Sequence, residues 1–217
     1  MEKFTCVTGA VLPLSIDNLD TDQIIPKQFL RGLDKSGLAG GCLFNLRFNA
    51  DGTPNPDCVF NRPGFADAPI ILAGPNFGCG SSREHAVWSL QQLGIRVVIA
   101  PSYGEIFYSN CFNNGLLAAR VTPEVSQELF SLVSDTTPVQ MTVDLENRTI
   151  AVAGVDRVFS FEIAARHRTM LLEGLDMVEN TMKDIATVNA FRQAHEAKFP
   201  WMTRLAGRTA RVLKTEA

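Results

Sequence analysis

The apolar residues of this chain gather in short runs that alternate with segments of helical spacing. The runs PIILA and IRVVIA, which end at Ala73 and Ala100, are rich in β-branched residues and predict strands buried on both faces. Between them, apolar residues recur on one helix face, and Gly94 follows where helices commonly end in left-handed backbone. The apolar stripe comprises Ala86, Val87, Leu90 and Leu93. The stretch 69–100 therefore predicts a βαβ unit with parallel strands.

The turn between the first of these strands and the helix, residues 74–82, is the expected place for chemistry and is called the glycine turn below. Ser81-x-x-Glu84 matches a capping box, in which Ser81 would cap the helix. Ligands in such sheets lie beyond the carboxyl ends of the strands, and glycines such as Gly80 let backbone N–H groups approach an anion. Arg83 adds a planar guanidinium suited to a carboxylate or phosphate. A strand-to-helix turn also uses glycine and serine for structural reasons alone, so both interpretations stay open at this point.

The remaining pattern extends this unit in both directions. A strand or hairpin is expected over 4–14, and a short helix with a glycine stop precedes another apolar strand over 116–121. Pro123 opens a further helix, three short strands form a meander, and the rest is helical with a break near Gly174. The sequence predicts an α/β fold whose mixed, mainly parallel sheet is flanked by helices and followed by a C-terminal helical segment.

A long segment from Lys27 to Pro69 lacks periodicity and is rich in Gly, Asn, Asp and Pro. Loops of this length inside a domain are usually functional or disordered. Its aromatic residues favour an ordered surface that meets a partner or a substrate. These residues are Phe29, Phe44, Phe48, Phe60 and Phe65. We expect this insertion to be mobile in the isolated chain, because its partner surface would be missing.

Composition and charge narrow the classes of function. The 217 residues are 46% hydrophobic and 20% charged with a net charge of -3, which suits a globular protein and excludes a basic nucleic-acid-binding footprint. One domain is expected over 1–202, followed by a basic tail over 203–217. No apolar run reaches the length of a membrane span, and the first residues lack the layout of a signal peptide, so the expected location is the cytoplasm.

The cysteines are odd in number, scattered and free of C-x-x-C pairs. They are Cys6, Cys42, Cys58, Cys79 and Cys111. This spacing predicts neither a disulfide framework nor an iron–sulfur ligand set, so a cluster would have to come from another chain. Most are expected to be inert core thiols. Cys79 differs, because a thiolate would be stabilised in the glycine turn near a helix start.

The glycine turn lacks the known nucleotide and esterase motifs. It has no lysine before its serines, no third glycine of a dinucleotide fingerprint and no G-x-S-x-G elbow. The three histidines, His85, His167 and His195, are expected to be structural. A helix terminus contributes about 0.3–2 kcal/mol, and one pKa unit corresponds to about 1.36 kcal/mol, so the helix alone cannot turn Ser81 into a base. A working alkoxide would need more positive charge, from Arg83 and from outside this chain.

Three acids stand within six positions in the turn-rich segment before the insertion. Asp17, Asp20 and Asp22 could suggest a calcium loop, but the glycine at the sixth position and the glutamate at the twelfth are missing, so no metal site is expected. From the residues alone, these side chains are expected to bond their own backbone in turns.

Four stretches of the sequence carry a resemblance to a known family: GPNFGCGSSREHAVWSL, NLDTDQIIPKQFL, VVIAPSYGEIFYSNCFNNGLL and RHRTMLLEGLDMV. They resemble the small subunits of bacterial-type 3-isopropylmalate dehydratase, in the aconitase superfamily. GSSREH and the Thr21-Asp22-x-Ile24 element are shared with the mobile swivel domain of aconitases, whereas NFGCGSSREHA with NCFNNGLL is specific to the small subunits. The match extends to about Met202.

The resemblance implies a β/β/α swivel domain that closes over a large subunit carrying a 4Fe-4S cluster, with no metal bound by this chain. By similarity, Ser81 would be the base that removes the proton beside a carboxylate. Asp22 would be an active-site acid, which replaces the turn interpretation for this residue. Arg83 would bind a substrate carboxylate that Ser82 orients, with Gly80 in the same site. The implied reaction exchanges 2-isopropylmalate and 3-isopropylmalate, both hydroxy di-acids, through isopropylmaleate in leucine biosynthesis.

Substrate choice depends on the loop after Asp22. Phe29 and Leu30 suit an apolar pocket around an isopropyl group, whereas Arg31 resembles the tripeptide of homoaconitase-type small subunits. Burying an isopropyl group is worth roughly 1.5–3 kcal/mol, and an unpaired arginine beside it would cost a similar amount, so Arg31 must point away if the substrate is an isopropylmalate. The alternatives are a related hydro-lyase acting on homoaconitate, citraconate or dimethylmaleate, or a non-catalytic anion-binding module.

Overall fold

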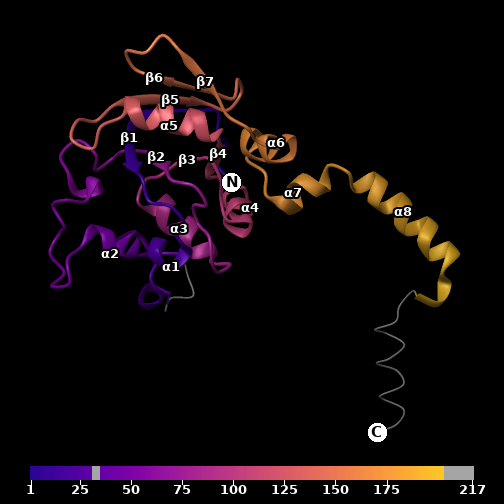
Figure 1. Ribbon diagram of the computed structural model, residues 1–217. Helices are drawn as coiled ribbons and strands as arrows, with labels where there is room; N and C mark the ends of the chain where they lie inside the picture. The colour runs from indigo at the N-terminus through magenta and orange to yellow at the C-terminus, as the bar shows by residue number, and fades with distance from the viewer. Residues whose placement is uncertain (31–34, 203–217) are drawn as a thin grey trace, which may run out of the picture. The chain divides into compact units, whose positions relative to one another are not determined.

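Seven strands form one mixed sheet in the order β4-β3-β2-β1-β5-β6-β7 (Figure 1). The computed structural model describes residues 1–30 and 35–202. The strands are β1 (Cys6–Leu14), β2 (Ile70–Ala73), β3 (Val97–Ala100), β4 (Leu117–Arg120), β5 (Gln140–Asp144), β6 (Thr149–Val152) and β7 (Val158–Ser160). The expected α/β class is confirmed, and so is the βαβ unit, since β2 and β3 pair in parallel.

Strand β1 joins two halves of the sheet. Its later residues, from Val11 to Leu14, pair in parallel with β2, while its earlier residues, from Cys6 to Ala10, pair antiparallel with β5. Strands β2, β3 and β4 continue the parallel half, and β5, β6 and β7 form the expected antiparallel meander. Three neighbouring pairs are therefore parallel and three antiparallel, so the antiparallel share is larger than the sequence predicts.

The helices of the first unit cover the two faces of the parallel half. They are α1 (Thr21–Ile24), α2 (Phe44–Arg47), α3 (Glu84–Gln92), α4 (Glu105–Asn114), α5 (Pro123–Leu132) and α6 (Ala165–Glu173). The connections from β1 to β2, β3 and β4 step across the sheet in one direction, so right-handed crossovers place their helices on one face. In Figure 1, α1 to α4 lie below these strands and α5 lies above them. The predicted site lies beyond the carboxyl ends of β1 and β2, next to the start of α3.

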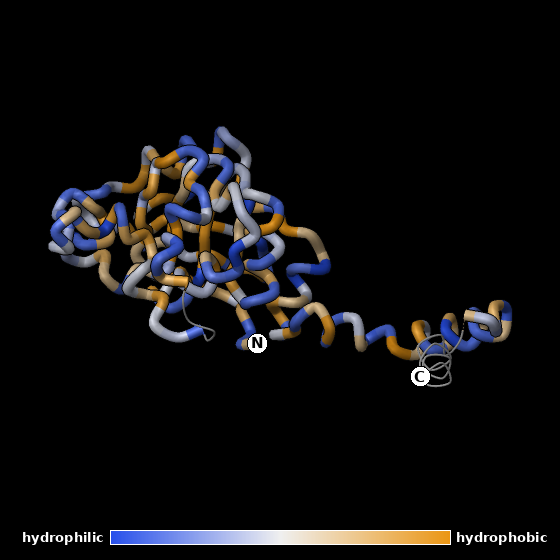
Figure 2. The backbone as a smooth tube through the Cα atoms, turned by 90° about the horizontal axis from the view of Figure 1, so that it is seen from below, coloured by the Kyte–Doolittle hydropathy of each residue, from blue (hydrophilic) through white to orange (hydrophobic). Residues whose placement is uncertain are grey.

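The two central strands form the middle of the core. Every residue of β2 and β3 is fully buried, as expected for apolar runs covered on both faces. Figure 2 shows hydrophobic stretches of the backbone in the interior of the first unit. Burying one such aliphatic side chain contributes roughly 1.5–3 kcal/mol, so these strands are a rigid base for the loops that follow them.

The insertion between α1 and β2 is folded onto the core. Its 3-10 helices are Lys27–Phe29, Ala39–Gly41 and Val59–Asn61. Phe60 and Phe65 are buried, so the expectation that all five aromatic residues form a surface is wrong for these two, which gain more from apolar burial. Phe29, Phe44 and Phe48 are half-buried, with successive ring centroids 5.0 and 4.9 Å apart. Mobility of the insertion in the isolated chain stays a prediction.

Helix α3 begins later than the sequence predicts. Its N-cap is Arg83 without a side-chain cap, so the capping box expected at Ser81 is wrong. The Ser81 hydroxyl lies instead 3.1 Å from the Thr21 hydroxyl, a contact across 60 positions that local spacing cannot reveal. A capping box does occur at α1, where Asp20 accepts from the Gln23 N–H and the Gln23 side chain accepts from the Asp20 N–H.

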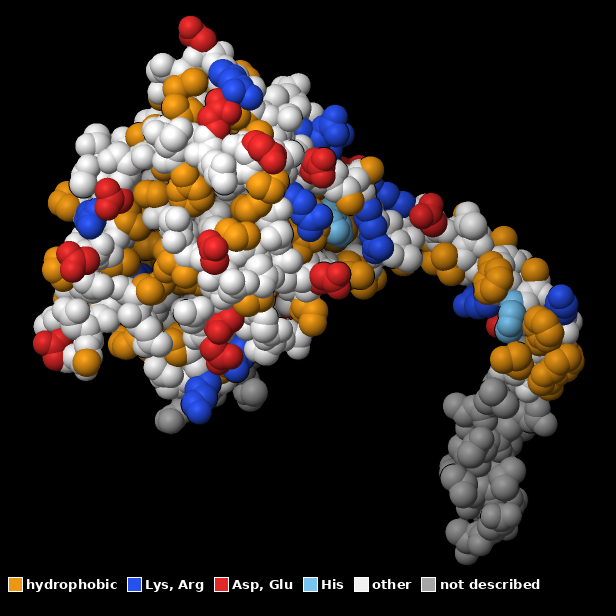
Figure 3. Space-filling model, viewed as in Figure 1, with side chains coloured by type: hydrophobic (Ala, Val, Ile, Leu, Met, Phe, Trp, Pro, Cys, Tyr) orange, Lys and Arg blue, Asp and Glu red, His pale blue; other side chains and the backbone are white. Residues whose placement is uncertain are grey.

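The chain divides into two compact units, of which the first is Met1–Asp176. The second contains α7 (Met177–Met182), α8 (Ile185–Lys198) and a 3-10 helix at Pro200–Met202. Large apolar side chains are exposed along α7 and α8, and Figure 3 shows hydrophobic groups on the surface of α8. No described helix is long and apolar enough to cross a membrane. The single domain expected over 1–202 stays a prediction, and the tail expected over 203–217 lies outside the described residues.

Candidate active site

Three loops meet beyond the carboxyl ends of β1, β2 and β3. The loop after β2 is bonded on one side to the loop after β1, through Gly78 N–H to the Leu19 carbonyl at 2.7 Å and Thr21 N–H to the Cys79 carbonyl at 2.9 Å. On its other side, Phe77 N–H donates to the Ser102 carbonyl at 3.1 Å. These backbone bonds fix the glycine turn between its neighbours, at the edge where parallel sheets bind ligands.

Glycine is needed at two positions of the glycine turn for different structural reasons. Gly78 has a φ of +71°, and a Cβ built there would lie 2.3 Å from the Phe107 ring, so the site is closed to any side chain. Gly80 has a φ of +90°, but the nearest atom to an added Cβ is the Asp20 Cβ at 3.5 Å. Glycine is therefore needed at Gly78 for both packing and backbone, and at Gly80 for the backbone alone.

Thr21 is the buried partner of the predicted base. It is 1% exposed, and its hydroxyl lies 3.1 Å from both the hydroxyl and the carbonyl oxygen of Ser81, which itself is exposed. Sequence reasoning did not include Thr21 among the site residues, although it begins the Thr21-Asp22-x-Ile24 element. Its burial and its partner come from the tertiary fold, and the motif was the available signal.

Asp22 and Arg83 form an ion pair beside this serine. The Arg83 Nη1 donates to the Asp22 carboxylate, with side chains 24% and 53% exposed. The structure therefore brings together four predicted residues, Asp22, Gly80, Ser81 and Arg83, on two neighbouring loops. Ser82, the fifth, is exposed next to them. A half-buried guanidinium that faces solvent at a strand end is suited to bind an anion.

The apolar residues predicted to line the substrate pocket lie further along the first loop. Phe29 is half-buried, and its ring packs against Gly41 and Phe44 rather than against the glycine turn. Leu30 is half-buried beside it. Arg31 lies outside the described residues. Phe29 and Leu30 thus share a loop with Asp22 but are positioned by a separate part of the insertion.

Two of the five cysteines, Cys42 and Cys111, are buried, so the expectation that most of them are core thiols is wrong. Burial raises the pKa of Cys42 to about 12 and raises the pKa of Cys111, so these thiols stay protonated, as expected for core residues. In the glycine turn, the Cys79 thiol donates to the Asn18 carbonyl at 3.3 Å. This bond gives Cys79 a role in joining the two loops. In the described residues, no group of three His, Cys, Asp or Glu side chains could hold a metal.

The histidines lie among aromatic rings, as expected for structural residues. His85 packs on Trp88 with ring centroids 4.7 Å apart, and His167 stacks on Phe112 at 4.1 Å. Burial, and then the neighbouring Arg166, lower the pKa of His167. His195 belongs to the second unit and lies between two phenylalanine rings. No described contact joins any of the three to Ser81, so a serine–histidine pair is not formed in the described part of the chain.

Comparison with known proteins defines the class to which this fold and site belong. The aconitase C-terminal domain family matches residues 1–124. A solved structure of 3-isopropylmalate dehydratase from Methanocaldococcus jannaschii is similar with a TM-score of 0.61 and 27% identity, covering 86% of this chain and 99% of that chain. The chain thus has the fold of the aconitase C-terminal domain.

Curated relatives define the family more narrowly. 3-Isopropylmalate dehydratase small subunit 1 from Chromobacterium violaceum is 47% identical over 205 residues, which cover 94% of this chain and 96% of the relative. The small subunit from Dinoroseobacter shibae is 45% identical over 203 residues, covering 93% and 100%. The chain belongs to the family of 3-isopropylmalate dehydratase small subunits, and the resemblance found in its motifs is confirmed.

Proposed function

We propose that this chain is the small subunit of a hydro-lyase that converts 2-isopropylmalate to 3-isopropylmalate through isopropylmaleate in leucine biosynthesis. The observation that carries the proposal is the juxtaposition of the Thr21–Ser81 hydroxyl pair with the Asp22–Arg83 ion pair on two loops at the strand ends. The family supplies the reaction class, and the site supplies groups suited to it. A cytoplasmic location is part of the proposal and follows from this biosynthetic role.

In this proposal, Arg83 binds a carboxylate of the hydroxy di-acid. A guanidinium has five N–H donors, and the bond to Asp22 uses Nη1, so a substrate carboxylate can be bound while Asp22 still orients the arginine. Ser82, exposed one residue before the N-cap of α3, is proposed to donate to the same carboxylate. The open backbone at Gly80 gives the substrate a close approach to the turn.

Ser81 is the proposed base. Its Oγ takes the proton from the carbon beside the bound carboxylate, and the electron pair of that C–H bond forms the double bond. The hydroxyl group leaves from the neighbouring carbon toward a Lewis acid that the partner would supply. Thr21 has one hydroxyl proton and two acceptors at 3.1 Å, the carbonyl and the hydroxyl oxygen of Ser81. When Thr21 donates to the Ser81 hydroxyl oxygen, it stabilises the serine as an alkoxide. Readdition of water with the two positions exchanged gives the isomer.

The second subunit is required by the chemistry of Ser81. This serine is exposed and lies outside the helix that follows, so nothing in the described residues lowers its proton affinity enough for catalysis. We propose that a large subunit covers the turn and carries a 4Fe-4S cluster, which would supply a Lewis acid for the substrate hydroxyl. The scattered cysteines of this chain are consistent with a cluster held by that partner.

The substrate is assigned from the apolar loop. Phe29 and Leu30 are the proposed wall around the isopropyl group, while Arg31 lies outside the described residues. The related acids homoaconitate, citraconate and dimethylmaleate are the competing substrates. No nucleic acid or membrane enters the proposal.

The direct test is an assay of the two subunits together and apart. We expect the complex of this chain with the large subunit to interconvert the isopropylmalates, and each chain alone to be inactive. The substrate assignment would be overturned if the complex preferred homoaconitate to isopropylmalate and if Arg31→Ala shifted this preference to isopropylmalate. Binding of di-acids without turnover by the complex would support an anion-binding module instead.

A further inference from the structure

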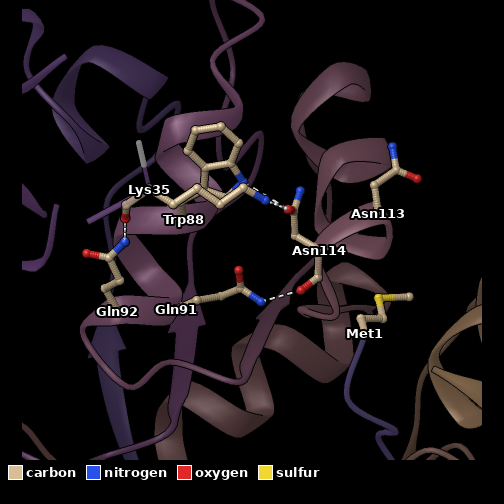
Figure 4. Close-up of a pocket in the computed structure, with 7 residues that line it drawn as sticks. All are labelled: Met1, Lys35, Trp88, Gln91, Gln92, Asn113 and Asn114. Atoms are coloured by element: carbon tan, nitrogen blue, oxygen red, sulfur yellow. Dashed lines mark hydrogen bonds between the residues drawn. The ribbon is translucent and has the colours of Figure 1, made fainter. Parts of the chain in front are cut away.

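The side chain of Gln92 at the end of α3 holds the segment that follows the proposed substrate loop. Its Nε2 donates to the Lys35 carbonyl (Figure 4). Its Oε1 accepts from the Leu38 N–H at 2.8 Å. Leu38 itself is 4% exposed. The exposed Gln92 amide thus bonds two backbone groups of the segment, and it fixes the segment against the helix because the Leu38 N–H has this amide as its acceptor.

The segment fixed by Gln92 leads directly into the backbone against which the Phe29 ring packs. The 3-10 helix Ala39–Gly41 begins one residue after Leu38. A Cβ added to Gly41 would lie 2.4 Å from the Phe29 Cγ, so the phenylalanine rests on the glycine backbone. From the other side, the Arg47 Nη1 donates to the Ala39 and Cys42 carbonyls, each at 3.0 Å.

We propose that Gln92 is a positioning residue for substrate specificity. Gln92 fixes Leu38, and Leu38 leads into Gly41, whose backbone supports the ring of Phe29. The proposed function places this ring beside the apolar substituent of the substrate. The same helix has Arg83 as its N-cap. Helix α3 therefore positions the proposed carboxylate-binding group, Arg83, at its beginning. At its end it positions the backbone that supports Phe29. The inference rests on the proposed function.

The neighbouring Gln91 provides a matched control. Its Nε2 donates to the Asn114 carbonyl on α4, on the other side of a pocket of about 330 Å³ drawn in Figure 4. Replacing either glutamine by alanine removes one side-chain amide from the last turn of α3, with the same small change in helix propensity. Gln92→Ala alone removes the bonds to Lys35 and Leu38.

The experiment compares Gln92→Ala and Gln91→Ala in the complex with the large subunit. The substrates are 2-isopropylmalate and its methyl analogue, 2-methylmalate, which differ only in the apolar substituent. We expect Gln92→Ala to raise KM for 2-isopropylmalate about tenfold relative to the methyl analogue, with kcat changed by less than about threefold, because a poorly positioned apolar wall discriminates by this order. Gln91→Ala should leave the ratio of the two KM values as in the wild type.

Hydrogen exchange at the Leu38 amide provides a readout that does not need activity. Exchange should be at least about tenfold faster in Gln92→Ala than in Gln91→Ala, and Gln92→Glu, which keeps an acceptor, should restore protection. Unchanged exchange in Gln92→Ala, or unchanged KM ratios with altered exchange, would overturn the inference. A wild-type complex inactive on both acids would overturn the proposed function instead, so the two failures are distinguishable.

Discussion

The hydroxyl oxygens of Thr21 and Ser81 lie 3.1 Å apart, although 60 positions separate the two residues in the sequence. Thr21 is buried by the fold of the loop after β1, while Ser81 is exposed on the loop after β2. The backbone bond from Thr21 N–H to the Cys79 carbonyl holds the two loops in this register. The proposed base is thus oriented by a residue from a different loop.

Thr21→Val should impair catalysis more than stability. The substitution keeps the shape of the side chain and removes the hydroxyl that bonds Ser81. Because a hydrogen bond to a charged group is worth about 1.5–3 kcal/mol, we expect kcat to fall about 10- to 100-fold in the complex, with KM little changed. Thr21→Ser keeps the hydroxyl and should retain most of the activity. Equal activity of the valine and serine variants would contradict a role for this bond.

Arg83→Lys should raise KM without unfolding the protein. A lysine keeps the charge but lacks the planar fork that binds a carboxylate, so we expect KM to rise at least about tenfold. The Asp22 partner is 53% exposed, so the free energy of unfolding should change by less than about 1 kcal/mol.

Arg157 offers a control for this substitution. It also forms an exposed ion pair, with Glu128 at 2.6 Å, in a part of the chain that the site does not include. Arg157→Lys should leave KM unchanged. An identical KM for the Arg83 and Arg157 variants would argue against carboxylate binding by Arg83.

The two glycines of the turn should differ in their tolerance of alanine. Gly78→Ala places a Cβ 2.3 Å from the Phe107 ring at a φ of +71°, and we expect a loss of about 2–5 kcal/mol from overpacking and backbone strain together. Gly80→Ala has room for the Cβ and should lose only about 1–2 kcal/mol from its left-handed backbone. Urea unfolding of both variants measures the difference. Equal losses would show that the contact with Phe107 does not limit the turn.

His167 should make the stability of the protein depend on pH. Burial lowers its pKa from the ordinary value of 6.5, so the unfolded chain takes up a proton before the folded chain does. The contribution of the neutral His167 side chain to the free energy of unfolding is therefore present above about pH 6.5. It is lost as the pH falls, because protonation favours the unfolded state. The ring faces Tyr108 and Phe112, and Arg166 is its charged neighbour. His167→Phe should lose less stability between about pH 7.5 and pH 5.5 than the wild type. An equal loss in both proteins would contradict this assignment.

The parts of the fold that local pattern determines were predictable from the sequence. The apolar runs of β2 and β3 are fully buried, Pro123 begins α5, and Gly94 ends α3 with a φ of +98°. Each depends on residues within a few positions of one another. The family motifs likewise indicated Asp22, Ser81 and Arg83, which the fold brings to adjacent loops.

The parts that depend on distant partners were not predictable. The spacing of Ser81 and Glu84 matches a capping box, but Thr21 is the partner of this serine in the folded chain. In the insertion, Phe60 and Phe65 have no periodic neighbours to indicate burial, and they belong to the same buried core cluster as strand residues from elsewhere in the sequence. Gln92 belongs to this class too, since its partners Lys35 and Leu38 precede it by more than 50 positions.

The role of Ser81 as the base of the reaction can be tested directly by a rate measurement. The measurement is the rate at which the complex with the large subunit forms isopropylmaleate from 2-isopropylmalate, compared between Ser81→Ala and the surface control Ser131→Ala. We predict that Ser81→Ala lowers kcat at least about 100-fold with KM within about threefold of the wild type, as loss of a general base requires. The control should match the wild type. A Ser81→Ala complex that keeps wild-type kcat would contradict the account.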